Sequence, residues 1–200
     1  MTEEERKNIT QAVQTAKKRI AEAAIASGRK PEDITLVAAT KMNDAERVRA
    51  AIEAGVDVCG ENRVQELLEK YEQHAYDGKP LHFIGTLQTN KVKYLIGKVS
   101  LIESVSSVKL AKVIDKEAAK AGICQDILLE LNIGREESKL GIDPDEIDSV
   151  IQQVAQLEQF RQNRSQIKKK LFILTECLNY LLTYRRKNTI ISPWTACRWE

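Results

Sequence analysis

The stretch Ile34-Thr-Leu-Val-Ala-Ala-Thr40, followed by Lys41, decides the fold. It is short, mostly apolar and rich in β-branched residues, which predicts a buried strand. The polar segment Gly60-Glu-Asn-Arg63 comes one structural repeat later, and His82-Phe-Ile-Gly85 comes after that. In a parallel barrel of strand-helix repeats, ligands bind at the carboxyl ends of the strands. The sequence therefore predicts that Lys41 and the polar residues after the next strand converge on such a face.

Strand and helix patterns alternate five times along the chain. An amphipathic helix precedes them, because apolar residues from Ile9 to Ala24 recur at helical spacing and Gly28 follows where a helix would stop. The first predicted strand leads into a helix capped by Asn43, with Glu46 three positions on. The predicted strands are Ile34–Thr40, Val56–Cys59, Leu81–Ile84, Leu101–Glu103 and Asp126–Asn132, and the helices that follow them are Asn43–Ala54, Arg63–His74, Asn90–Ile96, Ser107–Ala121 and Pro144–Leu157.

The regular spacing of these units predicts an α/β fold. The strand starts are separated by 22, 25, 20 and 25 residues, which favours a parallel sheet with right-handed helical crossovers. A barrel and a doubly wound sheet both fit this spacing. Only 41 residues remain after Gln159, too few for three more units, so we expect an incomplete TIM-barrel-like array of five units.

Composition excludes several classes of protein. The chain of 200 residues is 42% hydrophobic and 30% charged with a net charge of +2, as in soluble globular proteins without a polyanion-binding bias. The acidic opening Met1-Thr-Glu-Glu-Glu5 lacks the apolar run of a signal peptide, so we expect a cytoplasmic protein. The cysteines, Cys59, Cys124, Cys177 and Cys197, are widely spaced and only two histidines are present, so no metal site or disulfide framework is predicted.

Charge divides the chain into two predicted regions. Residues 1–160 hold 22 Lys and Arg against 27 Asp and Glu, whereas residues 161–200 hold 9 against 2. The last region also lacks glycine, since none follows Gly141. We therefore predict a (β/α) domain over residues 1–159 and an atypical basic tail over residues 160–200.

Several motifs in series carry a family resemblance. They are Leu36-Val-Ala-Ala-Thr-Lys41, Gly60-Glu-Asn-Arg-Val-Gln-Glu-Leu-Leu-Glu-Lys70, His82-Phe-Ile-Gly-Thr-Leu-Gln-Thr-Asn-Lys91 and Glu137-Ser-Lys-Leu-Gly141. Over residues 1 to about 159 the chain resembles the pyridoxal phosphate homeostasis proteins, which have the barrel of the alanine racemase N-terminal domain without its second domain. The resemblance implies a protein that binds pyridoxal 5'-phosphate and buffers or delivers it without evident catalysis.

The resemblance also implies the site residues. Lys41 corresponds to the lysine that holds pyridoxal 5'-phosphate as an aldimine, and a partly desolvated lysine at a barrel mouth suits that chemistry because only the neutral amine attacks an aldehyde. Asn62 corresponds to a residue beside the pyridine ring, although an asparagine there could equally cap a helix. Glu61 and Arg63 are expected to form an ion pair at the rim. Lys139 is either a second lysine at the mouth or a solvated loop residue.

The resemblance stops in the last part of the chain. Family members continue with a Gly-Leu-Met strand, a Leu-Ser-Met-Gly-Met-Ser segment and an Arg-Ile-Gly segment, the last two gripping the phosphate, and none of these is present. Instead, Arg161 to Lys170 is basic, and the apolar run Leu171–Leu182 is too short to span a bilayer. That run could be a core helix or lie on an anionic membrane, or the coding frame could shift near residue 160.

Three functions therefore stay open on the sequence alone. The first is a non-catalytic carrier of pyridoxal 5'-phosphate on Lys41, with cofactor-accepting enzymes as partners. The second is an amino-acid racemase, for which we find no second base opposite Lys41, since Tyr71, Tyr76 and Tyr94 fall on helices or their ends. The third is an inactive, truncated or frameshifted remnant. Neither nucleic-acid binding nor a transmembrane segment is predicted, and we expect a monomer or a weak homo-oligomer.

Overall fold

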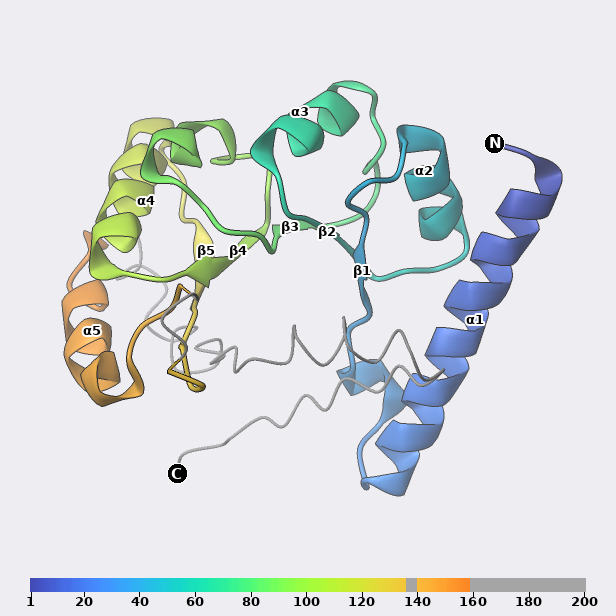
Figure 1. Ribbon diagram of the computed structural model, residues 1–200, viewed down its shortest axis with the longest axis horizontal. Helices are drawn as coiled ribbons and strands as arrows, with labels where there is room; N and C mark the ends of the chain where they lie inside the picture. Colours follow the sequence, from blue (N-terminus) through green and yellow to red (C-terminus); the bar gives the residue numbers. More distant parts are fainter. Residues whose placement is uncertain (136–139, 159–200) are drawn as a thin grey trace. The chain divides into compact units, whose positions relative to one another are not determined.

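The computed structural model describes residues 1–135 and 140–158. The strands form one parallel sheet in chain order, β1-β2-β3-β4-β5 (Figure 1). Their bounds are β1 Val37–Ala39, β2 Val58–Glu61, β3 Leu81–Phe83, β4 Leu101–Val105 and β5 Asp126–Leu129. The described residues divide into two compact units, one from Met1 to His82 and the other beginning at Phe83.

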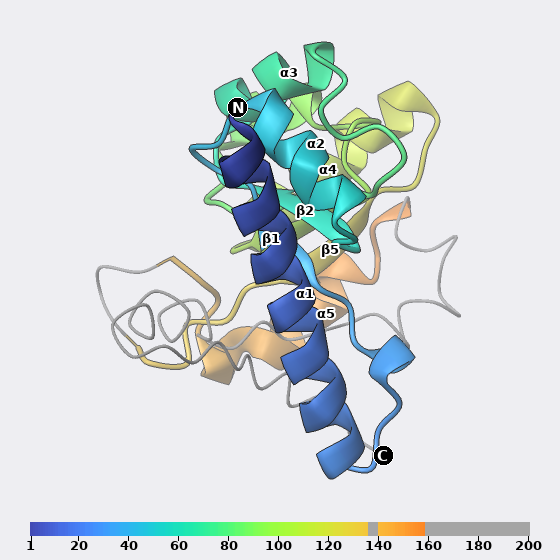
Figure 2. The same ribbon diagram turned by 90° about the vertical axis from the view of Figure 1, so that its right-hand side faces the viewer.

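The first unit begins with the long helix α1, Glu3–Ala26. Thr2 and Glu5 form a capping box at its start, in which each side chain bonds the backbone of the other residue. Gly28 follows the last turn with a φ of 73°, a left-handed conformation that glycine adopts without steric cost. Helix α1 packs along α2, Ala45–Glu53, and the far end of α1 reaches the 3-10 turn at Pro31–Asp33 (Figure 2).

The first two strands pair in parallel within this unit. The register places Ala38 beside Cys59 and Ala39 beside Gly60. The predicted first strand, Ile34–Thr40, is too long, because only Val37–Ala39 forms a ladder with β2. The predicted cap of the next helix is also wrong: Asp44 is the N-cap of α2, and its side chain accepts a hydrogen bond from the Arg47 amide.

Helix α3, Val64–Glu72, follows β2 and packs on it. Its central residue Leu67 is fully buried, which anchors the helix to the core of the unit. Arg63 is the N-cap residue and makes no side-chain capping bond. The other end of β2 is held by the Cys59 amide, which donates to the carbonyl of Pro80 at 3.0 Å.

The second unit contains β4 and β5 with their helices. Helix α4, Val108–Ala121, follows the N-cap Ser107 and ends at Gly122 in the left-handed conformation, close to the predicted range Ser107–Ala121. The predicted helix Asn90–Ile96 is instead a 3-10 helix, Thr89–Tyr94, whose N-cap is Gln88 and not Asn90. The β4–β5 pairing is parallel with an irregularity between Ile102 and Val105.

The last described segment is more irregular than predicted. Strand β5 ends at Leu129, and the chain then makes an isolated bridge between Leu131 and Ile142. The final predicted helix divides into a 3-10 turn, Pro144–Glu146, and helix α5, Ile147–Val154. Pro144 stands at the start of this turn, where the missing N–H costs no helical hydrogen bond.

The predicted fold class is confirmed: a parallel five-stranded sheet with helices between the strands. Among the described residues, no helix combines the length and the apolar character needed to cross a bilayer. Lys139, Cys177, Cys197 and the basic tail over residues 160–200 lie outside the described residues. The boundary near residue 159 therefore stays a prediction.

Candidate functional site

Lys41 lies in the turn directly after β1, where the sequence places it. Its side chain is half-buried, whereas Thr40 before it is buried. Met42 after it has a φ of 61°, unusual for a residue other than glycine, and is 91% exposed. Among the described residues, no hydrogen bond or ion pair is recorded for the Lys41 amine. The chain therefore offers a primary amine at the carboxyl end of a strand.

Asn62 follows β2 at the corresponding position. The Thr40 amide donates to the Gly60 carbonyl at 2.9 Å, so the β1–β2 register continues past the strand ends and brings Lys41 level with Asn62. The Asn62 Oδ1 atom is buried and has no hydrogen-bond partner among the described residues. Because Arg63 is the N-cap of α3, the alternative role of Asn62 as a helix cap is not realised. At this edge, a buried amide oxygen and an amine lie on neighbouring strand ends, and neither has a partner in the part of the chain that the structure describes.

A cluster of buried polar groups lies beneath this edge. Glu61 is fully buried, and its Oε1 atom accepts from Thr40 Oγ1 at 2.7 Å, Lys70 Nζ at 2.8 Å and Tyr76 Oη at 2.9 Å. Burial and the neighbouring Glu61 carboxylate raise the pKa of Tyr76. The cluster satisfies one oxygen of Glu61 three times over, while Oε2 has no partner among the described residues.

Glu66 connects this cluster to the Lys41 turn. Its Oε1 atom accepts from Lys70 Nζ at 2.7 Å and from the Met42 amide at 2.5 Å. Burial acts to raise the pKa of Glu66, but hydrogen bonds from Lys70 and Met42 outweigh it and leave the pKa below its usual value. Glu66 is therefore held as a carboxylate between a cation and a backbone donor.

The predicted ion pair between Glu61 and Arg63 is wrong. Glu61 points into the core and pairs with Lys70, whereas Arg63 is exposed. Sequence reasoning treated Lys70 only as part of a motif. The signal was available, since Glu66 and Lys70 have the i, i+4 spacing that pairs side chains on one helix face.

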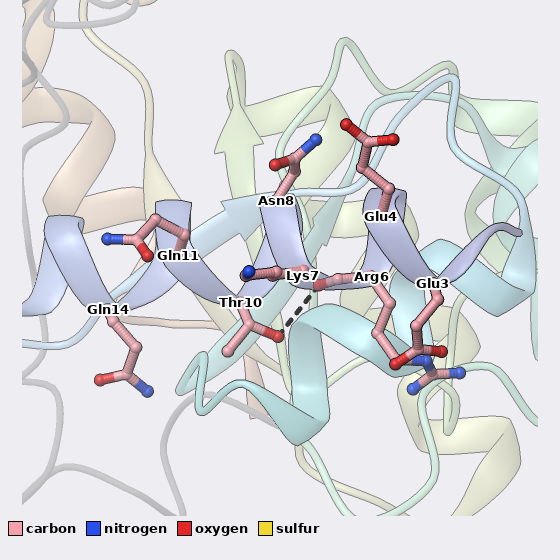
Figure 3. Close-up of a pocket in the computed structure, with 8 residues that line it drawn as sticks. All are labelled: Glu3, Glu4, Arg6, Lys7, Asn8, Thr10, Gln11 and Gln14. Atoms are coloured by element: carbon pink, nitrogen blue, oxygen red, sulfur yellow. Dashed lines mark hydrogen bonds between the residues drawn. The ribbon is translucent and has the colours of Figure 1, made fainter.

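A shallow hollow elsewhere in this unit does not compete with the strand-end site. All its lining residues come from one face of α1, and the one hydrogen bond drawn there is local, from Thr10 Oγ1 to the Arg6 carbonyl (Figure 3). The lining residues are Glu3, Glu4, Arg6, Lys7, Asn8, Thr10, Gln11 and Gln14. Side chains of a single helix do not converge on a ligand, so the hollow is not a candidate site.

Neither metal nor thiol chemistry is indicated in the described part of the chain. Residues 1–135 and 140–158 contain no cluster of three or more potential metal-ligating side chains. Cys59 is buried in β2, and burial raises the pKa of its thiol to about 11. A thiol with this pKa is protonated near neutral pH and behaves as a small apolar core residue.

Comparison with known proteins identifies the family of this strand-end site. The family model described as "Alanine racemase, N-terminal domain" matches residues 7–164. The chain belongs to this family. Within the matched residues, Lys41 follows β1 and Asn62 follows β2.

The chain is also similar in sequence to individual proteins. The chain is 44% identical over 139 residues to the pyridoxal phosphate homeostasis protein of Aquifex aeolicus, covering 70% of this chain and 61% of that protein. It spans about three fifths of the length of the curated relatives it matches first, at 61% and 62%.

Two solved structures are similar in fold and sequence. One is a Bifidobacterium adolescentis protein described as unknown, with a TM-score of 0.74 and 36% identity over 80% of this chain and 68% of that one. The other is PipY of Synechococcus elongatus with PLP bound, with a TM-score of 0.59 and 26% identity over 84% of this chain and 77% of that one.

The residues at the β1–β2 edge fit one end of a pyridoxal cofactor. An aldehyde needs a primary amine, and Lys41 has one without a recorded partner among the described residues. A polar ring needs hydrogen-bonding groups, and the buried Asn62 Oδ1 atom is available. The glycine-containing segments that the resemblance assigns to the phosphate are absent from the sequence, so the fit concerns the aldehyde and ring end.

Proposed function

We propose that this chain binds pyridoxal 5'-phosphate through Lys41 and Asn62, and that it serves in homeostasis of this cofactor as a non-catalytic carrier. One observation supports the proposal: at the carboxyl edge of parallel strands, a half-buried amine lies level with a buried amide oxygen, and neither has a partner among the described residues. The names of the Aquifex relative and of the PLP-bound PipY structure support the same cofactor.

Each residue has a chemical task in this proposal. The bound cofactor supplies an aldehyde that condenses with a primary amine. Lys41 would supply that amine from its half-buried position in the turn after β1. Asn62 offers Oδ1 to a donor on the bound molecule, which would satisfy an atom that is otherwise costly to bury. Thr40 and Glu61 hold the edge beneath them through their mutual hydrogen bond.

A carrier role is favoured over racemisation. Racemisation requires a second proton-transferring group that faces the substrate opposite Lys41. Among the tyrosines of the described residues, Tyr76 is buried and donates its hydroxyl to Glu61, while Tyr71 and Tyr94 are 40% exposed. None of these tyrosines has a geometry that recommends it as that base.

The decisive experiment is reductive fixation of the cofactor on the purified chain. The protein is mixed with pyridoxal 5'-phosphate and reduced with borohydride, and the modified residue is mapped by mass spectrometry. We expect fixation predominantly at Lys41, and its loss in Lys41→Ala. Asn62→Ala should still be fixed at Lys41, at lower occupancy at limiting cofactor.

A matched control separates a site from surface labelling. Lys18→Ala removes an exposed lysine on α1 and should leave fixation at Lys41 unchanged. Equal labelling of many lysines, or undiminished fixation in Lys41→Ala, would contradict the proposal. An assay with alanine as substrate tests the absence of racemase activity.

The biological setting belongs to the same proposal. A carrier of this kind would act in the cytoplasm and deliver its cofactor to enzymes that use it, as a monomer or weak homo-oligomer. Co-purification of such enzymes with the loaded chain, compared with Lys41→Ala, tests the partners.

A further inference from the structure

Helix α3 holds both peptide bonds of Lys41. The Thr40 carbonyl belongs to the peptide bond before Lys41, and it accepts from Lys70 Nζ at 2.7 Å. The Met42 amide belongs to the peptide bond after Lys41, and it donates to Glu66 Oε1 at 2.5 Å. Glu66 and Lys70 are themselves joined at 2.7 Å. A single ion pair therefore bridges the two sides of the residue that offers the free amine.

The ion pair is itself firmly placed. Lys70 is buried and also bonds the fully buried Glu61 at 2.8 Å. Leu67 lies between Glu66 and Lys70 on α3 and is fully buried in the core. The spacing of the pair on α3 lets both side chains point the same way. The acceptor and donor that meet the Lys41 turn are thus fixed by the core rather than by the turn.

The turn needs this support because its own backbone is unfavourable. Met42 has a φ of 61°, a left-handed conformation that costs a residue with a Cβ atom about 1–2 kcal/mol. The Met42 side chain is 91% exposed, so packing of that side chain contributes little to hold the turn. The turn is closed locally by the Asn43 amide, which donates to the Thr40 carbonyl at 3.3 Å, and by Asn43 Nδ2, which donates to the Lys41 carbonyl at 3.1 Å. The hydrogen bond from the Met42 amide to Glu66 is the contact from outside the turn that helps to compensate the unfavourable backbone.

We propose that Glu66 and Lys70 are positioning residues that fix the direction in which the Lys41 amine is presented. The proposal rests on the proposed function in one respect, that Lys41 is the reactive amine. Holding a reacting group in one geometry raises its rate of reaction by removing unproductive orientations. Neither residue touches the bound molecule in this account, and each acts through the backbone on either side of Lys41.

The test measures exchange of the Met42 amide and the reactivity of Lys41 in the full chain. Glu66→Gln removes the charged acceptor, and Glu69→Gln makes the same change in charge at an exposed position of the same helix. In Glu66→Gln we expect the Met42 amide to exchange about tenfold faster, by loss of a charge-assisted hydrogen bond. Time-limited fixation of pyridoxal 5'-phosphate at Lys41 should fall at least about threefold by the same loss. Glu69→Gln should match the unmodified chain in Met42 amide exchange and in fixation at Lys41.

An internal reference separates positioning from loss of stability. The Cys59 amide is bonded to the Pro80 carbonyl in the same unit but not to the turn. Equal acceleration of Met42 and Cys59 exchange would mean general destabilisation and would overturn the proposal, as would unchanged exchange at both. Glu66→Asp keeps the charge but shortens the reach, so it should act like Glu66→Gln, and it replaces that variant if the latter fails to fold.

Failure of the proposed function remains distinguishable from failure of this inference. If the unmodified chain is not fixed at Lys41, the carrier function is wrong, yet Met42 exchange still reports whether Glu66 holds the turn. If the unmodified chain is fixed at Lys41 and Glu66→Gln changes neither readout, the carrier function stands and the positioning role is wrong.

Discussion

The turn after β1 and the inner face of α3 each carry a lysine, and the two lysines are used in opposite ways. Lys70 on α3 is buried and meets three acceptors, on Thr40, Glu61 and Glu66. Lys41 in the turn is half-buried, and no partner is recorded for its amine among the described residues. The Lys70 amine is engaged by a carbonyl and two carboxylates, whereas the Lys41 amine is left open to an incoming aldehyde by the described residues.

The comparison shows how one lysine supports the turn that carries the other. Lys70 donates a hydrogen bond to the carbonyl of Thr40, the residue before Lys41. Residue type alone does not distinguish the two lysines. What separates them is the number of acceptors that the fold brings within hydrogen-bond distance.

Lys70→Met should have the largest effect on stability, because it removes the ordered lysine of the pair. The change leaves Glu61 fully buried without its cation and removes the bond to Thr40. Removing one partner of a buried ion pair costs about 3–5 kcal/mol, and we expect a loss of that size in the free energy of unfolding. Urea denaturation at neutral pH measures it.

The control for this variant is Lys18→Met on the exposed face of α1, which should change the free energy of unfolding by less than about 0.5 kcal/mol. Adding Glu61→Gln to Lys70→Met removes the stranded charge and should recover part of the loss. A cost for Lys70→Met no greater than that of the control would mean that the buried pair contributes nothing to stability.

Glu66→Gln should remove a contribution to stability that depends on pH. Burial opposes ionisation of Glu66, but the bonds from Lys70 and Met42 leave its pKa below the usual value in the folded state. A lowered folded-state pKa stabilises the protein above the unfolded-state value, about 4.3, and this stabilisation is lost as pH falls through the folded-state pKa. At pH 7 we expect the free energy of unfolding of the unmodified chain to be about 1–2 kcal/mol larger than that of Glu66→Gln.

The same measurement at decreasing pH supplies the check. The stability difference should hold from neutral pH to about pH 5 and shrink below about pH 4. Glu69→Gln, which has no recorded bond to the turn, should show no such change. A difference that stays constant down to the acid transition would mean that the charge of Glu66 is not what stabilises the turn.

Much of this arrangement follows from sequence, and the rest depends on packing. Apolar runs bounded by glycine and proline predict the parallel α/β class, and the polar residues after Thr40 and Gly60 predict the strand-end site. The partner of Glu61 could not be derived, because pairing it with nearby Arg63 or distant Lys70 depends on which way β2 faces. The register of a strand decides that, and a shift by one residue reverses every side chain.

Met42→Asn should have the smallest effect and bears most directly on how the two regions depend on each other. Asparagine accepts the left-handed conformation more readily than methionine, and the Met42 side chain is too exposed to lose much packing. We expect a gain of up to about 1 kcal/mol in the free energy of unfolding, while Met42→Val, which is β-branched, should lose a similar amount. If the turn relies on Glu66 because the backbone at Met42 is unfavourable, Glu66→Gln should lower the free energy of unfolding less in the Met42→Asn background than alone. A double-mutant cycle measures this coupling. Additive effects would mean that the bond to Glu66 and the strain at Met42 are independent, and that α3 does not compensate the backbone of the turn.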